Sequence, residues 1–138
     1  MNSKSGSILI IDDNQDILIA SKMLLKKTYP LVVTESDPNR IPILLARQTF
    51  DVILLDMNFS LDASSGQEGF YWLDKILSLD TNAVVILMTA YGDVNTAVKA
   101  VKAGATDFVL KPWQNQKLFT TITSAMALKE SRQEVCVL

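Results

Sequence analysis

Five side chains that could carry out chemistry each follow the end of a short apolar run. Three are carboxylates, one is a hydroxyl and one is an ammonium group: Asp12 and Asp13 after Ile8–Ile11, Asp56 after Val52–Leu55, Thr89 after Val84–Met88, and Lys111 after Phe108–Leu110. Taken one at a time, each has an ordinary alternative role as a helix cap, a turn residue or a solvated charge. Unrelated capping needs would not place all five at the same end of four runs, so together they favour a common site.

The residue types of this set favour a divalent cation beside a phosphoryl acceptor. Three crowded carboxylates repel one another unless a cation or a proton intervenes, and oxygen ligands without Cys or His select a hard ion such as Mg²⁺. Asp56 is the candidate nucleophile, because aspartate carboxylates can form acyl phosphates. Lys111 would pair with this carboxylate and then with phosphoryl oxygens, to which Thr89 would donate a hydrogen bond. Such chemistry depends on positioning and charge neutralisation more than on proton transfer.

The elements expected to position these side chains alternate along the chain. The apolar runs predict strands of a parallel sheet covered by helices on both faces, and they are Ile8–Ile11, Leu31–Val33, Val52–Leu55, Val84–Met88 and Phe108–Leu110. Apolar stripes with helical spacing lie between or after them, namely Ile17, Ser21, Leu24 and Leu25; Val94, Ala97, Val98 and Val101; and Leu118, Ile122, Ala125 and Lys129. Five β–α units in sequence predict a doubly wound α/β sandwich. Ligands of such sheets bind beyond the carboxyl ends of the strands.

A few residues mark the expected ends of these elements. Asp93 is a candidate cap for the helix over Val94–Val101, and Gly104 stands where that helix should end. The helical pattern of Asn39–Arg47 is weaker, because Pro42 is acceptable only in a first turn. The second strand ends at Glu35 and is expected to contribute nothing to the site.

Composition narrows the classes of function. The chain has 138 residues, 49% of them apolar, which suits one domain. A net charge of −2 argues against nucleic-acid binding by this chain. The absence of histidine and the single Cys136 exclude a His-dependent catalytic pair and an internal disulfide. No apolar stretch approaches the ~20 residues of a membrane span, and a cytoplasmic location is the default expectation.

The motifs around the five side chains resemble the receiver domain of bacterial two-component response regulators. The resemblance covers roughly residues 7 to 128 and is carried by the strings Ile10-Ile11-Asp12-Asp13, Leu54-Leu55-Asp56-Met57, Met88-Thr89-Ala90-Tyr91-Gly92-Asp93 and Ala103 to Pro112. It implies a flavodoxin-like (CheY-like) five-stranded parallel sheet of order 2-1-3-4-5 with five helices. The implied protein is a regulatory phosphoacceptor that catalyses only its own phosphorylation and dephosphorylation.

The resemblance also implies a role for each site residue. Asp56 would accept a phosphoryl group from a phosphohistidine of a sensor histidine kinase. Asp12, Asp13, Asp56 and the backbone carbonyl of Asn58 would hold Mg²⁺. Thr89 would be the switch hydroxyl, Lys111 the phosphoryl-binding lysine, and the Lys111–Pro112 bond is expected to be cis. Phe108 occupies the switch-aromatic position, although core packing alone would also explain it.

Two further features refine this expectation. The glycine that opens the third helix in most receivers is matched by Gly69, so the preceding loop reads as an insertion of several residues, either a tolerated surface loop or a lid. The string Thr89 to Asp93 and Trp113 resemble the nitrogen-regulation branch, whose members combine a receiver with an ATPase and a helix-turn-helix domain and act with an alternative sigma factor. Residues 1–129 would then be the receiver, and 130–138 a stub or linker to an output domain. A homodimer through the fourth helix and fifth strand is expected by analogy.

Other classes of function fit the sequence less well. A flavin-binding protein would need a phosphate loop where Asp12 and Asp13 stand, and the GxGxxG and GxxxxGK[ST] motifs are absent. A Mg²⁺-dependent phosphatase with an aspartate nucleophile would want a second acid where Asn58 stands. A stand-alone receiver in a phosphorelay, or an interaction module with a vestigial acidic site, remains an alternative.

Overall fold

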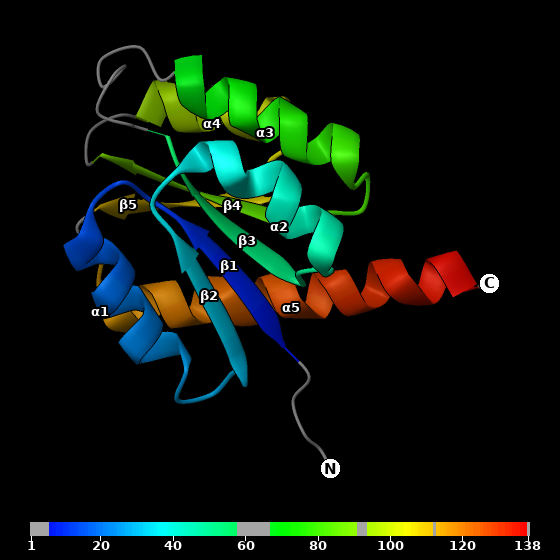
Figure 1. Ribbon diagram of the computed structural model, residues 1–138, viewed down its shortest axis with the longest axis horizontal. Helices are drawn as coiled ribbons and strands as arrows, with labels where there is room; N and C mark the ends of the chain where they lie inside the picture. The colour runs from blue at the N-terminus through cyan, green and yellow to red at the C-terminus, as the bar shows by residue number, and fades with distance from the viewer. Residues whose placement is uncertain (1–5, 58–66, 91–93, 112, 138) are drawn as a thin grey trace.

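A five-stranded parallel sheet between two layers of helices forms the protein (Figure 1). The computed structural model describes residues 6–57, 67–90, 94–111 and 113–137. The strand order is β2-β1-β3-β4-β5. In chain order the elements are β1 (Ser7–Ile11), α1 (Gln15–Leu25), β2 (Leu31–Glu35), the 3-10 helix η1 (Pro38–Arg40), α2 (Ile41–Arg47), β3 (Val52–Asp56), α3 (Gln67–Leu79), β4 (Val85–Ala90), α4 (Val94–Lys102), β5 (Asp107–Lys111) and α5 (Asn115–Val137). The predicted fold and strand order are confirmed.

The sheet separates two hydrophobic cores. Helices α1 and α5 cover one face, and α2, α3 and α4 cover the other (Figure 1). Successive side chains of a strand point to opposite faces, so Leu9 packs with α2 and α3 whereas Ile8 packs with α1 and α5. Because both faces are covered, every position of β3 is buried, which explains an apolar run without polar alternation.

The strands extend beyond the apolar runs that predicted them. The pairing includes Ser7 in β1, Glu35 in β2, Asp56 in β3, Ala90 in β4, and both Asp107 and Lys111 in β5, whereas β4 begins one residue later than predicted, at Val85. Backbone hydrogen bonding continues through polar residues, because it does not depend on the side chain. Asp56 and Lys111 are therefore the last residues of their strands and Thr89 the last but one, so none of the three lies in a loop.

Two of the predicted boundary signals act as expected. Pro42 lies in the first turn of α2, directly after η1. Gly104 follows α4 with φ of +120°, a backbone conformation that side chains disfavour. The candidate cap Asp93 lies outside the described residues.

The last helix is longer than its apolar stripe. Of the predicted stripe, Leu118, Ile122 and Ala125 are buried in the core with α1, and Lys129 is buried beside the turn before β4. The helix then continues to Val137 and projects past the edge of the sheet away from the strand ends that carry the candidate site (Figure 1). Residues 130–137 are therefore helical. Within the described ranges, no helix is long and apolar enough to cross a membrane.

Candidate functional site

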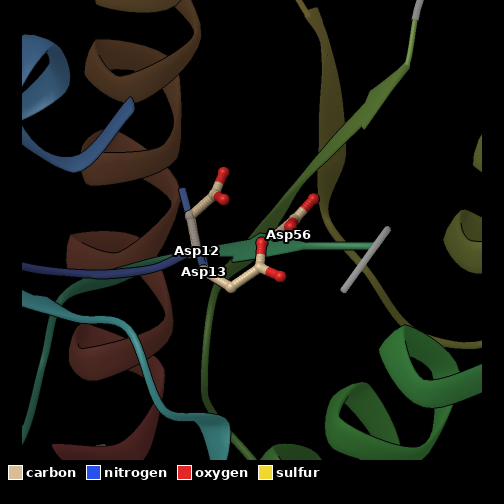
Figure 2. A group of neighbouring side chains, drawn as sticks. All are labelled: Asp12, Asp13 and Asp56. Carbon is tan, nitrogen blue, oxygen red and sulfur yellow. The ribbon is translucent and has the colours of Figure 1, made fainter. Parts of the chain in front are cut away.

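Three of the predicted side chains meet at the carboxyl edge of the two central strands. Asp12 and Asp13 follow β1, and Asp56 ends its neighbour β3. One carboxylate oxygen from each of the three lies within 4.8 Å of the others. Figure 2 shows the three side chains close together. Asp12 and Asp56 are buried, whereas Asp13 is exposed. The site is thus open to solvent on the side of Asp13.

A lysine from the edge strand bridges the two buried carboxylates. The Nζ of Lys111 donates to Oδ2 of Asp12 at 2.9 Å and to Oδ1 of Asp56 at 2.9 Å. Lys111 lies on β5, two strands away from β3, so its long side chain spans the end of β4 to reach them. Four of the five predicted residues are therefore brought together directly.

The charges of this cluster do not cancel. Burial, followed by the charge of Asp56, raises the pKa of Asp12 from its ordinary value of 3.8 to about 6. Burial alone would lower the pKa of Lys111, but the charges of Asp56 and Asp12 outweigh it and raise that pKa above 10.5. Within the described part of the chain, one ammonium, that of Lys111, lies beside the cluster of three carboxylates. This surplus of negative charge and the all-oxygen donor set fit a divalent cation such as Mg²⁺.

The cap of the first helix is a different residue from those considered in the sequence. The side chain of Asn14 accepts hydrogen bonds from the backbone N–H of Asp16 at 2.9 Å and of Ile17 at 3.4 Å. Asp12 instead accepts from the N–H of Asn14 at 2.9 Å through Oδ1. Asp12 is therefore oriented by Asn14 and Lys111. Sequence reasoning missed Asn14, although asparagine before a helical run is a signal for a cap.

Thr89 completes the predicted set at the end of β4, beside β3. It is fully buried, and its Oγ1 makes no hydrogen bond to any of the described residues. Buried hydroxyls are rarely left in this state. The hydroxyl is therefore available to a group that enters the site.

The remaining predicted residues lie at the periphery or beyond the described residues. Phe108 is partly buried and packs against the core formed with α3 and α4. Glu35 pairs with Arg40, whose Nε lies 3.0 Å from Oε1, and it is not one of the three carboxylates that cluster among the described residues. Asn58, most of the inserted loop, and Pro112 with its expected cis bond lie outside the described residues.

Comparison with known proteins identifies the family of the chain. Residues 8–123 match the response regulator receiver domain family. The curated relatives include the response regulator protein FleR of Pseudomonas aeruginosa, 30% identical over 86% of this chain and 24% of its own length. The alginate biosynthesis transcriptional regulatory protein AlgB of the same organism is 32% identical over 85% of this chain and 25% of its own. The chain thus spans about a quarter of the relatives it matches.

Solved structures agree with the fold. The N-terminal signal receiver domain of a response regulator from Bacteroides fragilis has a TM-score of 0.80 and 41% identity, covering 89% of this chain and 98% of that domain. NtrX from Brucella abortus has a TM-score of 0.85 at 23% identity, over 96% of this chain and 30% of its own, which supports the fold alone. The names of the two curated relatives describe a response regulator and a transcriptional regulatory protein. The chain belongs to the response regulator receiver domain family of two-component systems.

Proposed function

We propose that Asp56 is the phosphoacceptor and that Asp12, Asp13, Thr89 and Lys111 assist the transfer. The observation that carries this proposal is the convergence of three carboxylates and one ammonium at the ends of β1, β3 and β5. A structural ion pair needs one carboxylate for one lysine. The additional buried carboxylate and the hydroxyl of Thr89 are explained by a charged group that enters the site.

In the proposed reaction, a carboxylate oxygen of Asp56 attacks the phosphorus of a phosphohistidine on a sensor histidine kinase. A phosphorus–oxygen bond forms, the phosphorus–nitrogen bond breaks, and the imidazole leaves with that electron pair and takes up a proton from solvent. Lys111 already donates a hydrogen bond to Asp56, and its ammonium group can form an ion pair with the phosphoryl oxygens once the phosphoryl group is transferred. Thr89 can donate its hydroxyl proton to one of them. Positioning and charge neutralisation then supply the catalysis.

Mg²⁺ is the proposed cofactor. Asp12, Asp13 and Asp56 would hold it, together with the backbone carbonyl of Asn58. The ion would offset the repulsion between the carboxylates and the incoming phosphoryl group. Burial and the raised pKa of Asp12 support this assignment, because a buried carboxylate with surplus negative charge around it favours a bound cation.

The proposed output of phosphorylation is a changed surface on α4 and β5. Movement of Thr89 towards the phosphoryl group would make room for Phe108, which packs against the α4 side of the sheet. Val98 and Val101 expose 44% and 40% of their surface on α4. This exposed apolar surface supports the proposed homodimer through the face of α4 and β5.

The wider context is also a proposal. Residues 1–129 would be the receiver, and 130–138 would lead into an output domain that activates transcription with an alternative sigma factor in the cytoplasm. The short coverage of the relatives and the continuation of α5 to Val137 support a connection of this kind. A stand-alone receiver in a phosphorelay would use the same site.

Labelling with a small acyl phosphate in the presence of Mg²⁺ tests the phosphoacceptor. Intact-mass measurement should show one added phosphoryl group on the wild-type chain, and Asp56→Asn should show none. Asp74→Asn, which changes an exposed aspartate of α3, is the matched control and should label normally. Labelling that survives Asp56→Asn would refute the assignment. Repeated turnover of the donor without a lasting adduct would favour the phosphatase alternative.

A further inference from the structure

Gly69, in the first turns of α3, lies against the backbone of the residue that follows Asp56. A Cβ at Gly69 would stand 2.6 Å from Sδ, 2.7 Å from Cα and 2.9 Å from the carbonyl oxygen of Met57. A Cβ in a folded protein essentially never comes within 3.0 Å of an atom to which it is not bonded. Two of the three atoms belong to the backbone, so they cannot avoid the contact by rotating a side chain.

The other described glycines face a different environment. A Cβ at Gly6 or Gly104 would meet side-chain atoms only, the nearest being Tyr29 Cδ1 and Leu77 Cδ1, each at 2.6 Å, and no backbone atom. Gly104 also has a positive φ, which explains its identity without any contact. Gly69 has no such conformational reason, and glycine within a helix is less favourable than alanine. Space beside Met57 is therefore the reason for a glycine at this position.

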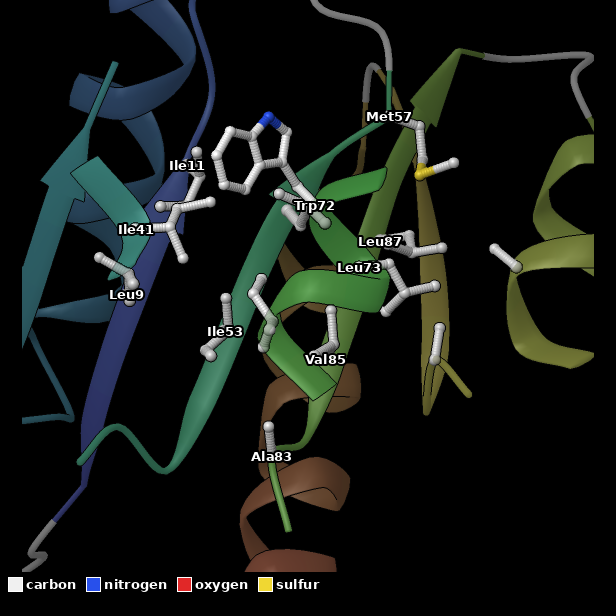
Figure 3. Close-up of a cluster of buried hydrophobic side chains, with 14 of the residues drawn as sticks. Leu9, Ile11, Ile41, Ile53, Met57, Trp72, Leu73, Ala83, Val85 and Leu87 are labelled. Atoms are coloured by element: carbon white, nitrogen blue, oxygen red, sulfur yellow. The ribbon is translucent and has the colours of Figure 1, made fainter. Parts of the chain in front are cut away.

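Met57 connects α3 with the two strands that carry Asp56 and Thr89. Its N–H donates to the carbonyl oxygen of Met88 at 2.9 Å, and Met88 directly precedes Thr89. The side chain of Met57 is fully buried in the core with Trp72 and Leu73 of α3 (Figure 3). The backbone that leaves Asp56 is thus held by β4 on one side and by the close approach of α3 on the other.

We infer that Gly69 is a positioning residue for the phosphoacceptor: its missing side chain lets α3 clamp the Met57 backbone and so holds Asp56 in register with Thr89 and Lys111. This inference rests on the proposed function. A methyl group at Gly69 must displace either α3 or Met57 by several tenths of an ångström. Misplacement of reacting groups by about 1 Å costs about 100-fold in rate, so we expect Gly69→Ala to lower the labelling rate of Asp56 between about 10-fold and 100-fold.

The matched control is Gly104→Ala. This change strains a positive φ and contacts Leu77, so it also destabilises the fold, but it lies before β5, at the amino ends of the strands and so at the opposite end from the site. Both variants are labelled with the same acyl phosphate, and each rate is divided by the folded fraction from urea unfolding. We expect Gly104→Ala to label at the wild-type rate. Without Mg²⁺, amide NMR shifts of Asp56, Met57 and Thr89 should change in Gly69→Ala and stay unchanged in Gly104→Ala.

The outcomes separate this inference from the proposed function. If neither the wild type nor Gly104→Ala is labelled, the phosphoacceptor assignment fails. If both are labelled and Gly69→Ala matches them, with unchanged amide shifts, the positioning role is overturned.

A second variant keeps the test decisive if Gly69→Ala folds poorly. Gly69→Ala combined with Met57→Ala removes the contact with Sδ and leaves those with Cα and the carbonyl oxygen. We expect this double variant to label at least about 10-fold more slowly than Met57→Ala alone, in keeping with a displaced acceptor. Equal rates would show that only the methionine side chain was in the way and would overturn the inference.

Discussion

A partly buried lysine and a fully buried one lie at opposite ends of the parallel strands, in different electrostatic surroundings. Lys111 ends β5 and touches two buried carboxylates, each at 2.9 Å. Lys129, in α5, is 3% exposed, and its Nζ donates to the backbone carbonyl of Asn82 at 3.0 Å. Its ion-pair contact, with Oδ2 of Asp80, is longer at 3.9 Å.

The difference separates the lysine of the proposed phosphoryl-transfer site from a lysine that ties two elements together. Among the described residues, Lys111 lies beside more carboxylates than one ammonium can neutralise, and this surplus fits the cation and phosphoryl group of the proposed function. Lys129 uses a neutral carbonyl to tie α5 to the turn before β4. Burial of a charged side chain is therefore not by itself a sign of a functional site. The surplus of opposite charge around it is the more informative property.

The two lysines should differ most in their effect on the rate of phosphoryl transfer to Asp56. We expect Lys111→Met to lower the rate of labelling at Asp56 about 100-fold, the usual effect of removing one group that stabilises developing charge. Lys129→Met should leave the labelling rate unchanged. Both rates are measured by intact mass over time with a small acyl phosphate. If the two variants slow to the same extent after correction for the folded fraction, the distinction between the lysines is wrong.

The free energy of unfolding should depend on pH through the carboxylate of Asp12. Because the folded pKa of Asp12 is raised to about 6, the protonated form stabilises the fold, and this contribution is lost as the pH rises from about 4 through about 6. A shift of about two units corresponds to at most about 3 kcal/mol. Urea unfolding without Mg²⁺ should show this loss in the wild type and in Lys129→Met.

The same experiment has an internal control. Asp12→Asn should remove this component of the pH dependence. Adding Mg²⁺ should stabilise the wild type at about pH 7.5 more than at about pH 4.5, because protonation of the carboxylates competes with the cation. A pH profile identical in the wild type and in Asp12→Asn would contradict the raised pKa.

Substitutions of Lys129 should change the stability of the fold and not the labelling rate. Lys129→Ala removes a buried hydrocarbon stem and a hydrogen bond, and we expect it to lower the free energy of unfolding by about 1–3 kcal/mol. Lys129→Met retains most of the stem and should cost less. Lys117→Ala, at an exposed position of the same helix, should have little effect. An equal loss in Lys117→Ala and Lys129→Ala would show that helix propensity, and not the buried contact, sets the cost.

The smallest expected effect is a difference in stability between substitutions of two exposed aspartates near the start of α1. Asp13→Asn should raise stability without Mg²⁺ by about 0.5 kcal/mol, because it relieves repulsion within the cluster. Asp16→Asn should lower stability slightly, because it removes a negative charge from the first turn of a helix. Opposite signs in thermal or urea unfolding would confirm that Asp13 belongs to the cluster. The same sign in both would contradict it.

Much of the site could be predicted from the sequence because its residues come at the ends of strands. In a parallel sheet the carboxyl ends of neighbouring strands share one edge, so the ends of Val52–Leu55 and Ile8–Ile11 were sufficient to bring Asp56 near Asp12. The roles of Asn58 and Pro112 stay predictions. The capping role of Asn14 was missed, because three polar residues in a row compete for one cap position.

The order of apolar and polar residues along the chain determined the alternation of strands and helices, the buried stripe of α5 and the end of α4 at Gly104. These are local properties, set by periodicity and backbone preference over a few residues. Only the tertiary structure decided that Lys111 reaches across β4 to two carboxylates, that Lys129 meets the carbonyl of Asn82, and that Gly69 must leave room for Met57. Such contacts depend on the distances between elements remote in sequence, which packing sets and periodicity does not record.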